Sequence, residues 1–62
     1  MYITRTITIR NNTAKIYRDT EWEEFRVKFF RDNDYLGEDA DYYCGDKEDA
    51  VQTAMHVLYN MQ

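Results

Sequence analysis

The sequence GDKEDAVQTAMHVLYNMQ, residues 45–62, has the pattern of one amphipathic helix. Asp46 stands where an N-cap residue belongs, and Asp49 occupies the third helical position, as in a capping box. Acidic residues in the first turn also suit the positive end of the helix dipole. The apolar residues recur at helical spacing and form one stripe: Ala50, Val51, Ala54, Met55, Leu58 and Met61. We therefore predict a C-terminal helix whose apolar stripe packs on a small sheet.

Three segments upstream of this helix alternate between apolar and polar residues, which predicts β-strands over residues 2–10, 13–18 and 22–31. In the first segment the threonines share one face and the isoleucines the other, although Arg5 interrupts the isoleucine side. The residues expected beneath the helix are Ile3, Ile7, Ile9, Ala14, Ile16, Phe25, Val27 and Phe29. One face of the sheet should therefore be apolar.

Polar residues that favour turns separate these strands. The expected turns are residues 11–12, 19–21 and 32–34, because Asn and Asp tolerate positive φ. A short fourth strand is predicted over residues 39–43, where acidic side chains suit the edge of a sheet. The fold class is therefore α+β. A single domain, residues 1–62, combines a three- to four-stranded antiparallel sheet with one C-terminal helix packed on one face.

The length of 62 residues allows only a thin core. A chain of this size buries only about 60% of its unfolded surface, and one helix covers one sheet face. The other face must be solvated or covered by a partner. The single cysteine excludes an intramolecular disulfide, and no apolar run or signal-peptide pattern is present. We expect a cytoplasmic protein with no membrane contact, in the host cell cytoplasm if a phage encodes it.

The net charge of −4 is unevenly distributed. Residues 1–31 contain seven basic residues against four acidic ones, a balance of +3. Residues 32–62 contain eight acidic residues against Lys47 alone, a balance of −7. This asymmetry predicts one basic and one acidic surface, or two halves that neutralise each other within the fold.

The residue types disfavour catalysis. The chain has no serine and only two glycines, so it lacks a Gly-rich phosphate loop, and its carboxylates lie in polar surroundings. Cys44 precedes the helix, where the dipole can lower a thiol pKa. However, His56 lies about three turns further along the helix, too far to act as its base. We expect neither an enzyme nor a bound cofactor, and we interpret Cys44 as a packed small residue.

Residues 32–37 begin like a calcium loop, with Asp32 and Asp34 at the first and third ligand positions and Gly37 at the sixth. The pattern then fails, because Leu36 replaces an oxygen ligand and Tyr43 stands where the bidentate Glu belongs. We therefore predict an acidic hairpin turn without a metal.

The outward face of the sheet is the candidate partner-binding site. Its predicted members are Tyr17, Trp22, Arg26, Lys28 and Phe30. Aromatic and basic side chains of this kind anchor protein interfaces, and they also stack and neutralise single-stranded nucleic acids. A third interpretation is that this face is simply the exposed side of the sheet and that its aromatic side chains shield a thin sheet. The acidic net charge makes nucleic acid the lesser alternative.

A second candidate is an acidic surface that would mimic nucleic-acid phosphates toward a basic target. Its members are Asp32, Asp34, Glu38, Asp39 and Asp41. The apolar and charged parts of the chain would also allow a symmetric homodimer, in which the same patch serves both copies.

The order FRVKFF…DNDYLGEDADYYCGDKEDAVQTAMHVLYNM, residues 25–61, resembles the later part of a double-stranded RNA-binding domain. In that family a strand, a turn and a strand lead into an alanine-rich helix. Its first helix has no counterpart here, and residues 46–49 replace its basic helix-start cluster with mostly acidic ones. The resemblance therefore implies similar packing and not RNA binding. The segment GDKEDAVQTAMHVL is also similar to the helix entry of HicB-type antitoxins.

The whole chain, above all NNTAKIYRDTEWEEFRVKFF and DADYYCGDKEDAVQTA, looks like short proteins of tailed bacteriophages. This resemblance implies an early-expressed or accessory protein that acts on a host macromolecule. Our leading hypothesis is a small α+β binding module that modulates a host protein and forms a homodimer.

Overall fold

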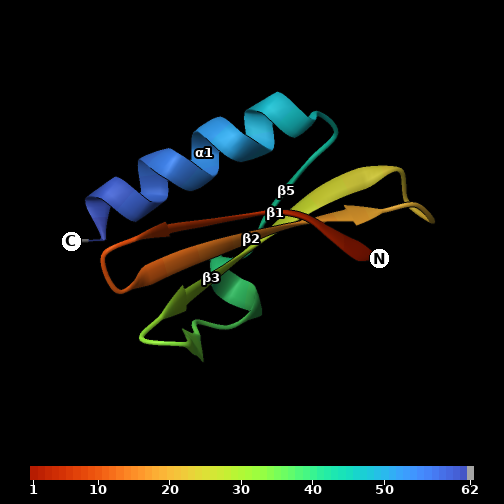
Figure 1. Cartoon of the computed structure of the whole chain (residues 1–62). Helices are drawn as coiled ribbons and strands as arrows, with labels where there is room; N and C mark the ends of the chain where they lie inside the picture. The colour runs from red at the N-terminus through yellow and green to blue at the C-terminus, as the bar shows by residue number, and fades with distance from the viewer. Residues whose placement is uncertain (62) are drawn as a thin grey trace.

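The structure is a computed structural model and describes residues 1–61. Its elements in chain order are β1 (Tyr2–Ile9), β2 (Asn12–Asp19), β3 (Glu24–Arg31), β4 (Asp34–Tyr35), the 3₁₀ turn η1 (Glu38–Ala40), β5 (Tyr42–Cys44) and α1 (Lys47–Asn60). Helix α1 covers one face of the antiparallel sheet, and η1 lies on the opposite side (Figure 1). The predicted α+β architecture with one C-terminal helix is thus confirmed.

The three long strands form a meander in the order β1–β2–β3. The short strands β4 and β5 share the outer edge of β3: β4 pairs with its end, through Phe30 and Tyr35, and β5 with its start, through Phe25 and Cys44. β1 forms one edge of the sheet, and β4 and β5 together form the other. β2 and β3 are therefore the central strands.

The hydrophobic core lies between α1 and the sheet. Its fully buried side chains are Ala14, Ile16, Val27, Phe29, Ala50, Ala54 and Leu58. The strand residues in this set are those that the alternation predicted beneath the helix, and Ile7, Ile9 and Phe25 pack against them at the margin. Alanines at two helical positions let α1 approach the sheet closely, since they add little side chain between the two layers.

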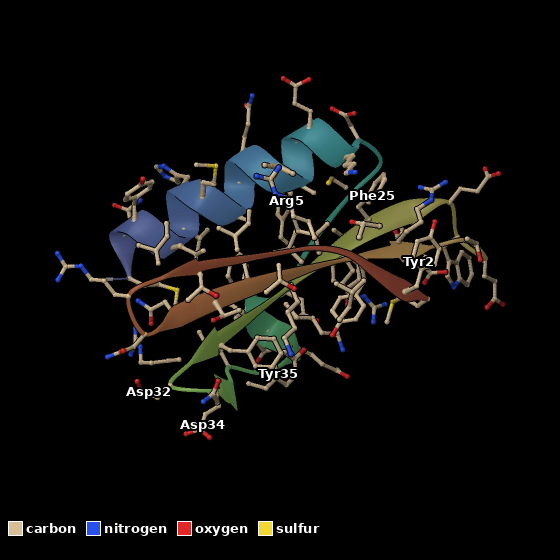
Figure 2. The ribbon with its side chains drawn as sticks, viewed as in Figure 1. Tyr2, Arg5, Phe25, Asp32, Asp34 and Tyr35 are labelled. Atoms are coloured by element: carbon tan, nitrogen blue, oxygen red, sulfur yellow. The ribbon has the colours of Figure 1, made fainter. Side chains whose placement is uncertain are left out.

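The start of β1 differs from the prediction. A register shift between Ile3 and Arg5 pairs Ile3 with Tyr17 but Arg5 with Ile16. The extra residue of this β-bulge turns Ile3 away from the core, and its side chain is 49% exposed. Arg5 stays on the helix-facing side, beside α1 (Figure 2). The prediction that Ile3 belongs to the core was therefore wrong.

The start of α1 is as predicted. Asp46 has an extended conformation, and its carboxylate accepts a hydrogen bond from the Asp49 N–H at 3.3 Å. The Asp49 carboxylate does not complete a capping box and instead accepts hydrogen bonds from the hydroxyls of Tyr42 and Thr53. This arrangement ties the first turn of α1 to β5.

The apolar stripe of α1 is rotated slightly from the predicted one. Met55 is exposed, and Val57 packs against the core although it was not assigned to the stripe. The helix ends at Asn60, with Met61 as its C-cap. The final residue of the predicted helix, Gln62, lies outside the described residues.

All three predicted turns differ from the observed ones in their bounds, the third because Asp34 belongs to β4. The first turn is formed by Arg10, which has φ 58°, and Asn11, whereas Asn12 belongs to β2. The second extends over residues 20–23, so Trp22 lies in a turn and not in β3. The third is a two-residue loop whose members Asp32 and Asn33 both have positive φ, as tight hairpins require.

The predicted fourth strand over residues 39–43 is replaced by two shorter pieces. Residues 38–40 form η1, and the strand β5 begins at Tyr42. Gly37, with φ 104°, allows the sharp change of direction from β4 into η1. Tyr42 packs against the core, which explains why this short edge strand keeps its place.

Candidate binding face

The sheet face opposite α1, here called the open face, carries the candidate site. The strand register aligns its side chains in rows across β2 and β3: Tyr17 pairs with Arg26, Lys15 with Lys28, and Thr13 with Phe30. Tyr43 extends the first row from β5, and Tyr35 extends the third from β4. Tyr35 points away from α1, whereas Arg5 and Phe25 lie on the helix side (Figure 2). On β2 to β5 the open face therefore consists of Thr13, Lys15, Tyr17, Arg26, Lys28, Phe30, Tyr35 and Tyr43. On β1 it is continued by Ile3, Thr6 and Thr8, which pair with Tyr17, Lys15 and Thr13.

Each cation of the open face lies over an aromatic ring. The Lys28 Nζ is 5.6 Å from the ring centroid of Tyr17 and 5.2 Å from that of Tyr35. The Lys15 Nζ lies 4.7 Å from the centroid of Phe30. At these distances a ring attracts the cation, and such contacts contribute about 0.5–1 kcal/mol at exposed sites. The face is therefore an ordered array and not a set of independent side chains.

Arg26 completes this array. Its guanidinium carbon lies 4.6 Å from the Tyr43 ring centroid, and Tyr43 itself is 45% exposed. The Nε atom of Arg26 is buried without a hydrogen-bond acceptor among the described residues. A guanidinium has five N–H donors in a fixed fork, and the Nε–H of Arg26 is one donor left unsatisfied within the described chain.

Tyr35 joins the open face to the segment that follows β4. Its ring lies 5.5 Å from that of Phe30 at an angle of 42°, and its hydroxyl donates to both oxygens of Asp41 at 2.8 Å. Loss of hydration raises the pKa of Tyr35 to about 12, together with the hydrogen bond to Asp41 and the nearby carboxylates. The hydrogen bonds to Asp41 thus hold the Tyr35 ring in the position where it contacts the Lys28 ammonium.

The structure brings together four of the five residues predicted for partner binding: Tyr17, Arg26, Lys28 and Phe30. Trp22 is separate, because it lies in the turn between β2 and β3 with 72% of its surface exposed. The Asp19 carboxylate holds this turn by accepting hydrogen bonds from the N–H groups of Glu21 and Trp22. Trp22 is therefore a neighbour of the open face and not part of its array.

The predicted acidic surface follows the chain from the end of β3 to the start of β5. Asp32 and Asp34 lie at the tip of the β3–β4 hairpin (Figure 2). Glu38 and Asp39 lie in η1. Asp41 is half-buried and bound to Tyr35. These carboxylates border the β3 edge of the open face, so the basic centre has an acidic margin.

Sequence reasoning missed Lys15, Tyr35 and Tyr43. Lys15 lies two residues before Tyr17 in the same strand, so the alternation alone would have found it. Tyr35 and Tyr43 reach the face from strands of two and three residues. Strands this short leave no periodic signal, and only the pairing with β3 places these rings.

Cys44 is packed and hydrogen-bonded, as a residue with a structural role would be. Its thiol donates a hydrogen bond to the Asp46 carbonyl at 3.3 Å, and the residue is partly buried against the core. Burial raises the pKa of the Cys44 thiol, and neighbouring carboxylates add to the effect. A backbone hydrogen bond at Asp46, the residue before the helix, lowers this pKa but does not outweigh burial, so the net direction is upward. A protonated, packed thiol is a poor nucleophile.

Over residues 1–61, no group of three or more His, Cys, Asp or Glu side chains is arranged to hold a metal ion. No helix in the same part of the chain combines the length and the apolar character needed to cross a membrane. The chain matches no protein-family model, no curated protein and no solved structure.

Proposed function

We propose that this protein is a small non-enzymatic binding module that docks a protein partner on its open face. The observation that carries this proposal is the array of Lys15, Arg26 and Lys28 over aromatic rings. Tyr and Arg are the residue types that most often dominate binding energy at protein interfaces. Here they lie at the centre of a face that the chain's own helix leaves uncovered.

The side chains of this array are already partly immobilised, which favours binding. Immobilising a long side chain at an interface costs about 0.5–1.5 kcal/mol. Lys28, held between Tyr17 and Tyr35, has already lost part of that freedom. Three cations at the centre of the face call for a partner surface that carries carboxylates. The resemblance to small bacteriophage proteins extends the proposal to a host protein as the partner and to modulation of that protein as the outcome.

A second copy of the chain is another protein that this face would accept. The acidic margin at Asp34, Glu38 and Asp39 lies beside the basic centre, so a two-fold axis would bring the margin of each copy to the centre of the other. We therefore propose that the module also forms a homodimer through the same face.

Capture from a bacterial lysate, followed by mass spectrometry, tests the proposal. The bait is the whole chain, compared with Lys28→Glu on the open face and Lys47→Glu in the first turn of α1. Both variants reverse one charge, but only Lys28 lies in the array. We expect Lys28→Glu to reduce capture of one protein at least about tenfold, since a desolvated interfacial charge contributes about 2 kcal/mol or more. Equal capture by both variants would refute the open face as the docking surface.

A single-stranded nucleic acid is the second candidate, because Lys28 between two tyrosine rings also resembles a base-stacking platform with a phosphate ligand. The net charge of −4 and the acidic margin oppose it. Repeating the capture after nuclease treatment separates the two candidates. A partner lost with nuclease, together with oligonucleotide binding that weakens steeply with salt, would replace the protein with a nucleic acid.

A further inference from the structure

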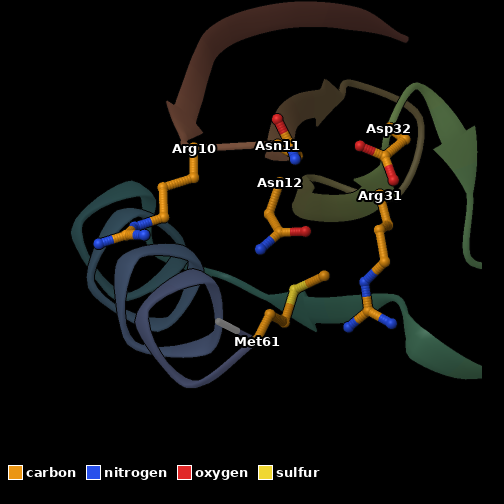
Figure 3. Close-up of a pocket in the computed structure, with 6 residues that line it drawn as sticks. All are labelled: Arg10, Asn11, Asn12, Arg31, Asp32 and Met61. Atoms are coloured by element: carbon orange, nitrogen blue, oxygen red, sulfur yellow. The ribbon is translucent and has the colours of Figure 1, made fainter.

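A second polar site lies at the opposite, helix-facing side of the sheet, where the β1–β2 and β3–β4 turns meet the end of α1. There a pocket of about 250 Å³ opens. Its lining residues are Arg10, Asn11, Asn12, Arg31, Asp32 and Met61 (Figure 3). None of these residues belongs to the array of the open face, although Asp32 also belongs to its acidic margin.

Asn12 is the unusual feature of this pocket. It is the one buried polar residue of the described chain, with 5% of its surface exposed. Its backbone pairs with both neighbouring strands, through Ile9 and Arg31, which fixes the position of the side chain. The side-chain amide points into the pocket (Figure 3), and neither of its polar atoms is among the buried atoms of the described residues that lack a hydrogen-bond partner. An amide that is accessible from a pocket can donate a hydrogen bond to an acceptor placed there.

Two guanidinium groups flank Asn12 from different strands. Arg10 occupies the left-handed turn position after β1, and Arg31 ends β3, so they reach the pocket from opposite sides (Figure 3). The Asp32 N–H donates to the Asn11 carbonyl at 2.9 Å and thereby ties the two turns together. This bond fixes the two backbone segments from which the arginine side chains extend.

The charges at the pocket favour an anion. Two guanidinium groups oppose one carboxylate, that of Asp32, and the negative end of the α1 dipole, which is worth about half an elementary charge. The balance remains positive. Guanidinium and amide N–H groups form their strongest hydrogen bonds with carboxylate or phosphate oxygens.

We propose that this pocket binds a small oxyanion group, a carboxylate or a phosphate, which Arg10 and Arg31 clamp while the Asn12 amide donates to it from below. The volume accommodates such a group with a few attached atoms. The site binds its ligand in a different part of the molecule from the protein partner.

Nuclear magnetic resonance of ¹⁵N-labelled protein tests this site. The probes are inorganic phosphate and acetate, added at constant ionic strength with chloride as the balancing anion. We expect the side-chain amide signals of Asn12 and the backbone signal of Asp32 to shift and to saturate. The anion with the lower saturating concentration identifies the preferred chemistry.

Three variants, each lacking one positive charge, test whether binding depends on the pocket arginines. Arg10→Gln and Arg31→Gln should each weaken binding at least about tenfold, because a hydrogen bond to a charged group contributes about 1.5–3 kcal/mol. Arg5→Gln removes the same charge from the same side of the sheet but not from the pocket, and should leave the titration unchanged. All three residues are exposed, so the variants should remain folded, which the same spectra verify. Shifts that rise without saturation, or equal weakening in all three variants, would overturn the proposal.

Discussion

Lys15 and Lys28 lie directly opposite each other on neighbouring strands of the open face. Like charges in such a cross-strand pair are destabilising, and a solvated sheet normally avoids them. Each ammonium instead lies over an aromatic ring, Lys15 over Phe30 and Lys28 over Tyr17 and Tyr35. The rings offset the repulsion and keep a concentrated positive charge at the centre of the face, where a partner would meet it.

This compensation is measurable by a double-mutant cycle between Lys28→Met and Tyr35→Leu. We expect a coupling of about 0.5–1 kcal/mol in the free energy of unfolding, the usual size of a cation–π contact at an exposed site. Urea denaturation of the four proteins provides the values. The cycle between Lys47→Met and Tyr35→Leu is the control and should show no coupling, because Lys47 begins α1 on the other side of the sheet. Equal coupling in both cycles would contradict a direct Lys28–Tyr35 interaction.

The second prediction concerns the core residue Phe29. This side chain is 2% exposed and is among the largest fully buried side chains of the domain. We expect Phe29→Ala to reduce the free energy of unfolding by about 3–5 kcal/mol, which would largely unfold so small a protein. Tyr43→Ala, at an exposed ring, should cost less than about 1 kcal/mol. Chemical denaturation of both variants checks the difference, and a similar small loss in both would mean that α1 does not pack on Phe29.

The sequence was informative wherever a long element repeats its pattern. Asp46 correctly indicated the helix start, and the alternation of β2 and β3 placed Ile16, Val27 and Phe29 correctly in the core. Strict alternation also assigned four residues to the open face, because a single register decides every side chain of a strand. The contact between Lys28 and Tyr17, which are diagonal neighbours on paired strands, depends in addition on the pairing of β2 with β3.

The remaining features depend on pairing, which local patterns do not encode. The bulge in β1 places Ile3 outside and leaves Arg5 on the helix side, although strict alternation puts both on the isoleucine side. Trp22 was predicted at the start of β3 on its outward side, but the Asp19 side chain accepts hydrogen bonds that form a turn there. The pocket at Asn12 combines two turns and the end of α1, so no single segment of sequence indicates it.

The ionisation of Tyr35 provides a third prediction. Its pKa is raised in the folded protein to about 12 from an ordinary value of 10.0, so folding favours the neutral phenol. The corresponding stability is fully present below pH 10 and is lost as the pH rises toward 12. Asp41→Asn removes the anionic acceptor and should lower the pKa of Tyr35. Ultraviolet titration of the tyrosines, with Tyr35→Phe as the reference, isolates this group. An unchanged curve in Asp41→Asn would show that the hydroxyl does not bind Asp41.

Self-association gives the last prediction, because the proposed homodimer uses the open face. We expect a dimer in analytical ultracentrifugation at micromolar concentration, and Tyr43→Glu should shift it toward monomer by placing a carboxylate beside Arg26, where it repels the acidic margin of the other copy. Trp22→Glu adds the same charge in the neighbouring turn, outside the array, and should weaken the dimer much less. If Trp22→Glu separates the copies while Tyr43→Glu does not, the turn is the interface and the open face remains free for a foreign partner. A parent protein that stays monomeric at high concentration would exclude the homodimer and leave the lysate capture as the test of what the face binds.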